Sequence, residues 1–142
     1  MIHNIYVLLD DGDRRVLQRF GLTLPQYRVL KALAEERDVR LTALSDRLLR
    51  AKSTITRIVD QLERDGLVTR ASDSDDRRAW RLALTPAGVE LLQAARAAHE
   101  EAVAYRFNQA LDAGEQARFS ELLTKLHDSL VDTLNTLGCR EE

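Results

Sequence analysis

The chain has 142 residues and a formal net charge of −2, and 44% of its residues are hydrophobic while only 5% are aromatic. This length fits one domain, or a small binding domain with helical dimerisation arms, and the apolar content excludes a globally disordered chain. A single cysteine excludes an internal disulfide, and no apolar run approaches the ~18 residues that a membrane-spanning helix needs, so we expect a cytoplasmic protein with no membrane segment.

Apolar residues between positions 2 and 20 predict an N-terminal helix, which Gly21 ends. The Asp-Asp-Gly-Asp run at 10–13 is expected to interrupt or loosen this helix. The same acidic run comes too early for the apolar region of a signal peptide.

A second helix is predicted from its capping signal. Thr23 can cap the helix, Gln26 lies three residues on as in a capping box, and Pro25 suits the first turn. The helix is expected to end near Glu36. Its core-facing residues are Tyr27, Val29, Leu30 and Leu33.

Two further helices follow. A short one opens at Thr42 and breaks near 49–52. A longer one begins around Ser53 and runs to about Asp65, with Gly66 well placed as a left-handed residue beyond its end. Four apolar residues of the longer helix have the spacing i, i+3, i+4, i+7, which predicts that they are buried. These residues are Ile55, Ile58, Val59 and Leu62.

A β-hairpin is the only strand signal in the chain. Short strands are expected at 67–70 and 79–84, and the polar residues 72–76 form the turn between them. Trp80, Leu82 and Leu84 alternate with smaller or charged residues and therefore share one face.

Two long helices complete the chain. Thr85 and Pro86 predict the start of an alanine-rich helix that continues to about Leu111, and residues 112–115 break the pattern. The last helix has a single apolar stripe. The stripe can belong to an intramolecular core or to a dimer seam. We interpret it as a dimer seam, because two long helices have more apolar surface than one small domain can cover. It comprises Phe119, Leu122, Leu123, Leu126, Leu130, Leu134 and Leu137.

This order of elements predicts a mainly α fold with a small β-hairpin wing, which is the winged helix-turn-helix plan, plus N- and C-terminal dimerisation helices. The charge distribution agrees with it. Residues 40–81 contain ten Arg and Lys against seven Asp and Glu, whereas the rest contains eleven against sixteen. A locally basic region on an acidic body favours a local DNA footprint.

The polar face of the helix at 53–65 contains hydroxyl, amide and guanidinium groups. The major groove admits one helix, and these groups can bond base edges or phosphates. The alternative is an ordinary amphipathic helix with a solvated face, and the hairpin favours DNA binding. Arg77 and Arg78 at its tip can enter a minor groove, with Asp76 orienting one of them, although a solvated charged turn is the alternative there.

Three segments together resemble the MarR (multiple antibiotic resistance regulator) family. They are 41–48, 52–68, and Asp-Arg-Arg at 76–78 followed by 82–88. The resemblance is strong from about Leu22 to Gly88, and outside that span it depends on helix order alone.

The resemblance implies a winged DNA-binding region at 22–88 and helical dimerisation regions at 1–21 and 89–142. It implies a homodimeric transcriptional regulator, a ligand-responsive repressor that binds a pseudo-palindromic operator in double-stranded DNA. Many members of the family release DNA on binding a small phenolic or other anionic effector.

The resemblance also suggests which residues bind. Ser53, Thr54, Thr56 and Arg57 match recognition-helix contact positions, while Arg78 matches the wing arginine. The predicted DNA-binding residues are Thr42, Arg50, Lys52, Ser53, Thr54, Thr56, Arg57, Gln61, Arg77 and Arg78, with Asp76 supporting the wing. The candidate residues of an effector pocket are Tyr6, Tyr27, Trp80 and His3.

The turn before the recognition helix departs from many relatives, which have Gly-Leu-Ser where this chain has Leu49, Arg50 and Ala51. Ala51 cannot cap the helix as Ser would, a loss of ~1 kcal/mol if nothing compensates. Ser53 is the alternative cap, which would divert its hydroxyl from DNA. Arg50 replaces an apolar residue and can point to phosphate.

Other functions have weaker support. The chain contains no phosphate loop or nucleophile motif, so we expect neither an enzyme nor a cofactor. His3, His99 and His127 lack metal-ligand spacing, although His99 and His127 can meet between the two long helices, and no metal is expected. Cys139, near the C-terminus, is interpreted as an incidental thiol. The rival functions are a protein-interaction module and a metal-dependent sensor.

Replacing Arg78 by alanine should weaken operator binding. The salt dependence of the affinity should flatten by about one unit for each phosphate contact that is lost. Titration of operator DNA at several salt concentrations measures both quantities. An unchanged slope and affinity would remove Arg78 from the binding site.

Overall fold

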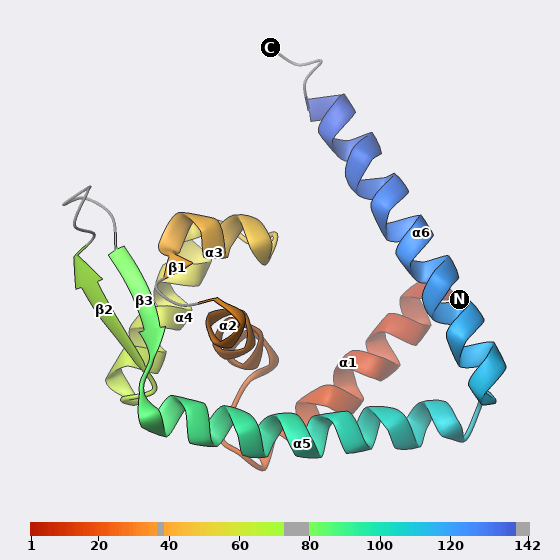
Figure 1. Ribbon diagram of the computed structural model, residues 1–142, viewed down its shortest axis with the longest axis horizontal. Helices are drawn as coiled ribbons and strands as arrows, with labels where there is room; N and C mark the ends of the chain where they lie inside the picture. Colours follow the sequence, from red (N-terminus) through yellow and green to blue (C-terminus); the bar gives the residue numbers. More distant parts are fainter. Residues whose placement is uncertain (37–38, 73–79, 139–142) are drawn as a thin grey trace. The chain divides into compact units, whose positions relative to one another are not determined.

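A computed structural model of the chain describes residues 1–36, 39–72 and 80–138, and it is mainly helical with a small antiparallel sheet, as predicted (Figure 1). The elements in chain order are α1 (Ile2–Gln18), α2 (Leu24–Glu35), β1 (Val39–Arg40), α3 (Leu41–Arg47), α4 (Lys52–Arg64), β2 (Val68–Ser72), β3 (Trp80–Leu84), α5 (Pro86–Asn108) and α6 (Ala113–Gly138). Contacts divide the chain into two compact units, Met1–Ala102 and Val103–Glu142. Within the described ranges, no helix is long and apolar enough to cross a membrane.

Helix α1 is continuous, so the predicted interruption at 10–13 is wrong. Two ion pairs, each joining residues one helical turn apart, explain the difference. Arg14 pairs with Asp10, and Arg15 Nε donates to Oδ2 of Asp11 at 2.8 Å. Such i, i+4 pairs stabilise a helix, and they offset part of the cost of the glycine within the acidic run.

Helix α2 begins with the predicted capping box. The Gln26 N–H donates to Thr23 Oγ1 at 3.3 Å, and the Thr23 N–H donates to Gln26 Oε1 at 2.9 Å. Two of the amides that a helix start leaves unpaired are thereby satisfied. The helix ends at Glu35, one residue before the predicted end.

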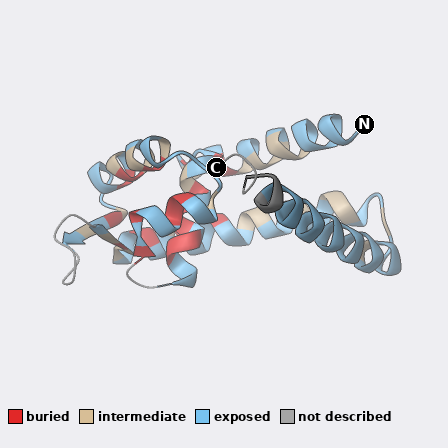
Figure 2. Ribbon diagram, turned by 90° about the horizontal axis from the view of Figure 1, so that it is seen from above, coloured by how far each residue is buried: buried red, intermediate tan, exposed pale blue. Residues whose placement is uncertain are grey.

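The first unit has one apolar core, formed where α2, α3, α4 and the sheet meet (Figure 2). Helix α4 contributes three of its four predicted core residues, and the fourth, Ile58, is partly buried. The largest fully buried side chains are Leu17, Val29, Leu30, Leu44, Ile55, Val59, Leu62, Val68 and Leu82. They come from every element between α1 and β3 except the short strand β1.

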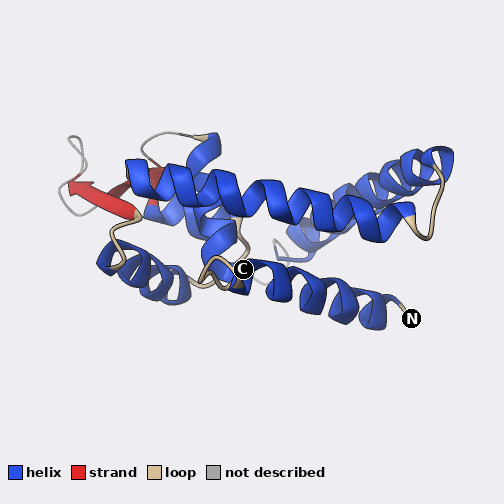
Figure 3. Ribbon diagram, turned by 90° about the horizontal axis from the view of Figure 1, so that it is seen from below, coloured by secondary structure: helices blue, strands red, loops and turns tan. Residues whose placement is uncertain are grey.

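The sheet is a small part of a mainly helical chain (Figure 3). Its three antiparallel strands lie in the order β1-β3-β2. Strands β2 and β3 pair along their whole length, which confirms the predicted hairpin. Ser72 was expected in the turn, but it belongs to β2 because it pairs with Trp80. Strand β1 was not predicted, because two residues are too few to show an alternating pattern. Its Val39 pairs with Leu82 of β3, and both side chains are buried.

A corner joins the end of α4 to the start of α5. The Thr85 N–H donates to the Leu67 carbonyl oxygen at 3.1 Å, and Thr85 Oγ1 donates to the Gly66 carbonyl oxygen at 2.7 Å. The same hydroxyl accepts from the Gly88 N–H at 3.0 Å, so Thr85 caps α5 as predicted. Helix α5 is thus fixed directly to the residues that follow α4.

The second unit contains the end of α5 and all of α6. Asp112 and Glu115 cap α6 reciprocally, since each backbone N–H donates to the other side chain at 2.9 Å. The rings of Phe107 and Phe119 lie 6.2 Å apart. The predicted stripe is exposed over the part whose side chains are described, which excludes Leu137. Its exposed members are Phe119, Leu122, Leu123, Leu126, Leu130 and Leu134.

Replacing Gly88 by alanine should destabilise the first unit. A Cβ at this position would overlap the Leu67 carbonyl oxygen and lie 3.0 Å from the carbonyl carbon. Backbone atoms cannot rotate away as a side chain can, so the free energy of unfolding should fall by at least about 2 kcal/mol. Chemical denaturation measures this change. The matched control is Gly114→Ala, whose Cβ meets only a side-chain oxygen of Asp112 at 3.3 Å and should change stability little. Equal effects of the two substitutions would contradict the close approach at Gly88.

Candidate nucleic-acid interface and adjacent cavity

Helix α4 has a polar face opposite its buried face. Ile55, Val59 and Leu62 anchor the helix in the core, which leaves the polar side chains toward solvent. The predicted contact residues that are exposed are Lys52, Ser53, Arg57 and Gln61 on α4, Thr42 on α3 and Arg50 in the turn. Thr54 and Thr56 are half-buried. A rigidly anchored helix with this face has the shape and chemistry that a major groove accepts.

The start of α4 has no side-chain cap. The helix begins at Lys52, one residue before the predicted start, and its N-cap is Ala51. Ser53 is the second residue of the helix, so it is not the cap and its hydroxyl is not diverted to that role. The first amides of α4 lack a side-chain acceptor, which suits them to a phosphate oxygen.

The turn between α3 and α4 holds Leu49 in a left-handed conformation, with φ +50°. The Leu49 N–H donates to the Asp46 carbonyl oxygen and the Arg50 N–H to that of Ser45, both at 3.1 Å, which is a Schellman motif. Leucine costs about 1 kcal/mol more than glycine in this conformation. The Leu49 side chain is 83% exposed, so no core contact offsets that cost.

Hydrogen bonds within α4 divide its polar residues into two groups. Thr56 Oγ1 donates to the Lys52 carbonyl oxygen at 2.8 Å, and Gln61 Nε2 donates to Asp65 Oδ1 at 2.9 Å. Lys52, Ser53 and Arg57 make no side-chain hydrogen bond to any other residue that the structure describes. These three side chains can therefore reach DNA without breaking an existing bond.

The wing is tied to α4 through an arginine that sequence reasoning missed. Arg70 of β2 pairs with Asp60 of α4, and its Nε lies 3.3 Å from Oε2 of Glu63. Arg70 is only 16% exposed, so solvent screens these pairs less than it screens a surface pair. Asp60 and Glu63 are three residues apart on one helix face, which was the available signal. The predicted wing residues Asp76, Arg77 and Arg78 lie outside the described residues.

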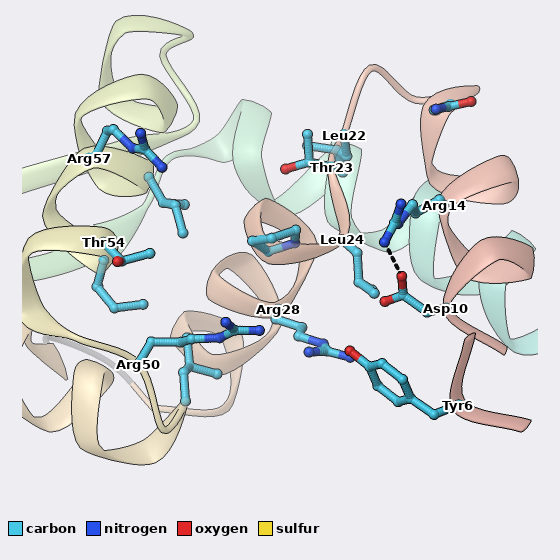
Figure 4. A pocket seen from close by; sticks show the side chains of 15 residues that line it. Tyr6, Asp10, Arg14, Leu22, Thr23, Leu24, Arg28, Arg50, Thr54 and Arg57 are labelled. Atoms are coloured by element: carbon cyan, nitrogen blue, oxygen red, sulfur yellow. Dashed lines mark hydrogen bonds and ion pairs between the residues drawn. The ribbon is translucent and has the colours of Figure 1, made fainter. Parts of the chain in front are cut away.

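A cavity of about 570 Å³ lies beside the start of α4 (Figure 4). Its lining comes from α1, α2, the α3–α4 turn and α4, and it includes four arginines and one aspartate. The lining residues are Tyr6, Asp10, Arg14, Gln18, Leu22, Thr23, Leu24, Pro25, Arg28, Leu48, Arg50, Thr54, Ile55, Arg57 and Ile58. Arg50, Thr54 and Arg57 therefore belong both to the cavity and to the predicted DNA-binding face.

Of the predicted pocket residues, Tyr6 lines this cavity, whereas Tyr27, Trp80 and His3 do not. Trp80 begins β3 and is 44% exposed. Tyr27 is buried, and its ring lies 5.1 Å from that of His99. Burial raises the pKa of the Tyr27 phenol above its ordinary value, and the carboxylate of Glu100 adds to the shift. Tyr27 thus belongs to the interior of the first unit.

Two of the three histidines have carboxylate neighbours. His99 Nε2 on α5 lies 3.2 Å from Asp13 Oδ1 on α1, and His127 Nδ1 lies 3.0 Å from Asp128 Oδ1. Across the described ranges, no three His, Cys, Asp or Glu residues are grouped as a metal site requires. Cys139 is outside those ranges.

Comparison of the sequence with known proteins identifies the family of this chain. A sequence model of the MarR family matches residues 22–80. The chain is 30% identical over 129 residues to YsmB of Bacillus subtilis, named as an uncharacterized HTH-type transcriptional regulator, and the match covers 91% of this chain and 88% of YsmB. It is 33% identical over 105 residues to the transcriptional regulator HosA of Escherichia coli, covering 74% of this chain and 77% of HosA.

A solved structure gives the same fold. A mutant of MarR from Escherichia coli, complexed with operator DNA, superposes with a TM-score of 0.82 at 23% identity, over 88% of this chain and 89% of that chain. At this identity the likeness concerns the fold. It confirms the predicted winged helix-turn-helix class.

Removing the Arg70 guanidinium should weaken DNA binding more than it weakens folding. In Arg70→Met the apolar stem is kept, so stability should fall by about 1–2 kcal/mol from the lost charged hydrogen bond to Asp60 and the lost ion pair with Glu63. The angle between α4 and the wing would be held by fewer contacts, so operator affinity of the folded protein should fall by about tenfold or more. DNA titration together with thermal melting separates the two effects. Arg70→Lys, which keeps one ion pair, should restore part of the affinity. A loss of stability with unchanged affinity would show that Arg70 has no positioning role.

Proposed function

The chain belongs to the MarR family of transcriptional regulators, and from this membership we propose that it binds operator DNA as a homodimer and releases it when a small anionic effector binds. Recognition helix α4 enters the major groove of each half-site. The two half-sites lie about one helical turn apart, as the two-fold symmetry of a dimer requires. Repression follows where the operator overlaps a promoter.

The observation that supports DNA binding best is that α4 has a buried apolar face and, opposite it, an exposed polar face. Its apolar side chains lie in the core, while Lys52, Ser53 and Arg57 are exposed and make no side-chain hydrogen bond within the described chain. Arg and Lys supply the phosphate contacts that dominate affinity, and the hydroxyl can bond a base edge. Arg50, in the turn before α4, adds a fourth polar contact.

The exposed stripe on α6 supports the homodimer. Leu122, Leu123 and Leu126 are each about half-exposed, and the stripe continues to Leu134. An apolar surface of this length is rarely left in water by a stable soluble protein. A second copy of the same helix has a matching stripe, so a symmetric dimer covers both.

The cavity beside α4 supports effector control. Its volume lies within the ordinary range for small-molecule sites, and its lining combines apolar side chains with a few charged ones. Because Arg50, Thr54 and Arg57 line it, an occupant contacts the same segment that we place on DNA.

DNA titration tests the proposal directly. The protein should bind a fragment from upstream of its own gene with a steep dependence on salt, which a hydrophobic protein-docking surface would not show. Arg57→Gln should lower the affinity and reduce the salt slope by about one unit if Arg57 makes one phosphate contact. Arg19→Gln, an exposed position at the end of α1, is the matched control and should change neither quantity. Folded protein that binds no palindromic DNA at low salt would overturn the proposal.

A further inference from the structure

The charges that line the cavity are not balanced. Its only carboxylate is Asp10, and Asp10 pairs with Arg14. Arg28, Arg50 and Arg57 have no ion pair with any residue that the structure describes. Three guanidinium groups therefore border one cavity without a counter-charge from its lining.

The directions of these side chains indicate where in the cavity an anion would bind (Figure 4). Arg50 extends from the α3–α4 turn across the cavity toward Arg28, and Arg28 extends toward the phenol of Tyr6. Like charges that border one cavity repel, and the repulsion grows where apolar walls exclude water. An anion between them removes that repulsion and can accept paired N–H bonds from both guanidinium groups.

The walls around the arginines are apolar. Five aliphatic side chains line the cavity, and Ile55 among them is fully buried. They are Leu22, Leu24, Leu48, Ile55 and Ile58. Burial of a ring against such walls adds the affinity that a small inorganic ion lacks. The cavity thus combines a place for an apolar body with a place for more than one negative charge.

We propose that the cavity binds a small organic dianion, an apolar ring with a phosphate ester or two carboxylates, held between Arg28 and Arg50. A monocarboxylate neutralises one guanidinium and leaves the other without a counter-charge, whereas a dianion neutralises both. The Tyr6 phenol, toward which Arg28 points, adds a neutral hydrogen-bond donor at the same side.

The dianion also acts on DNA binding, and this step depends on the proposed function. Arg50 cannot pair with a dianion inside the cavity and with a DNA phosphate outside it at the same time. Arg57 borders the same cavity from α4. A bound dianion therefore withdraws at least one phosphate contact, and affinity for DNA falls together with its salt slope.

Calorimetric titration of the full chain without DNA tests the ligand class. The probes are phenyl phosphate, isophthalate and benzoate at about pH 8, where a phosphate monoester carries close to two charges. We expect at least one of the two dianions to bind at least about tenfold more tightly than benzoate, since paired charged bonds add to the same ring burial. The dianion that binds more tightly shows whether the site prefers a phosphate ester or two carboxylates. Equal affinity for benzoate and both dianions, or no binding by any probe, would overturn the proposal.

Variants locate the site. Arg28→Gln and Arg50→Gln should each abolish most of the preference for dianions while leaving benzoate affinity within a few-fold, and Arg19→Gln should bind all probes as the unaltered protein does. Arg28→Lys keeps the charge but loses paired donors, so it should have an intermediate preference; this second variant also serves if Arg28→Gln does not fold. A preference that survives both glutamine substitutions would place the dianion elsewhere and overturn the assignment.

Competition with operator DNA tests the regulatory step separately. Dianion binding that releases DNA from the unaltered protein supports both proposals. Calorimetric binding of the dianion to a protein that binds no DNA would overturn the proposed function while supporting the ligand class. Dianion binding without any effect on bound DNA would overturn the regulatory step.

Discussion

Thr85 makes the connection on which the arrangement of the first unit depends. Its hydroxyl donates to the Gly66 carbonyl oxygen at 2.7 Å and accepts from the Gly88 N–H at 3.0 Å, so one side chain joins the end of α4 to the first turn of α5. Gly88 is required there because a Cβ would overlap the Leu67 backbone. The residues that follow α4 are therefore fixed to the first turn of α5 by close contacts that tolerate little adjustment.

The N-terminal end of α4 is held less firmly. Its N-cap is Ala51, which offers no side-chain acceptor, and the preceding turn holds Leu49 at a positive φ. Both features reduce stability at this end. The C-terminal end, in contrast, is followed by a glycine and a hydrogen-bonded corner. The weakly held end is also the end that borders the cavity and that approaches DNA bases most closely in helix-turn-helix proteins. An occupant of the cavity thus contacts the end of α4 that lacks a side-chain cap.

Local signals in the sequence were sufficient for most of the fold. The capping box at Thr23 and the proline after Thr85 each marked a helix start, and the spacing from Ile55 to Leu62 marked the buried face of α4. Prediction failed where an element is stabilised by a contact that the local sequence pattern does not include. The acidic run in α1 suggested a break, but arginines four residues on pair with it. Strand β1 exists because β3 lies beside it, and a two-residue strand has no periodicity of its own.

The cavity was beyond sequence reasoning for a different reason. Its three unbalanced arginines come from α2, the turn and α4, and no spacing in the chain brings them together. Only the packing of α2 against α4 does so, through a core that contains Leu30 and Ile55. The predicted basic region at 40–81 includes Arg50 and Arg57 but not Arg28. A count of charges along the sequence therefore assigns these three arginines to different regions, although they line the same cavity. A DNA phosphate and a small dianion present the same chemistry to these arginines. The two ligands differ in the apolar body that only the cavity can bury, and this difference allows one set of cations to serve both binding and release.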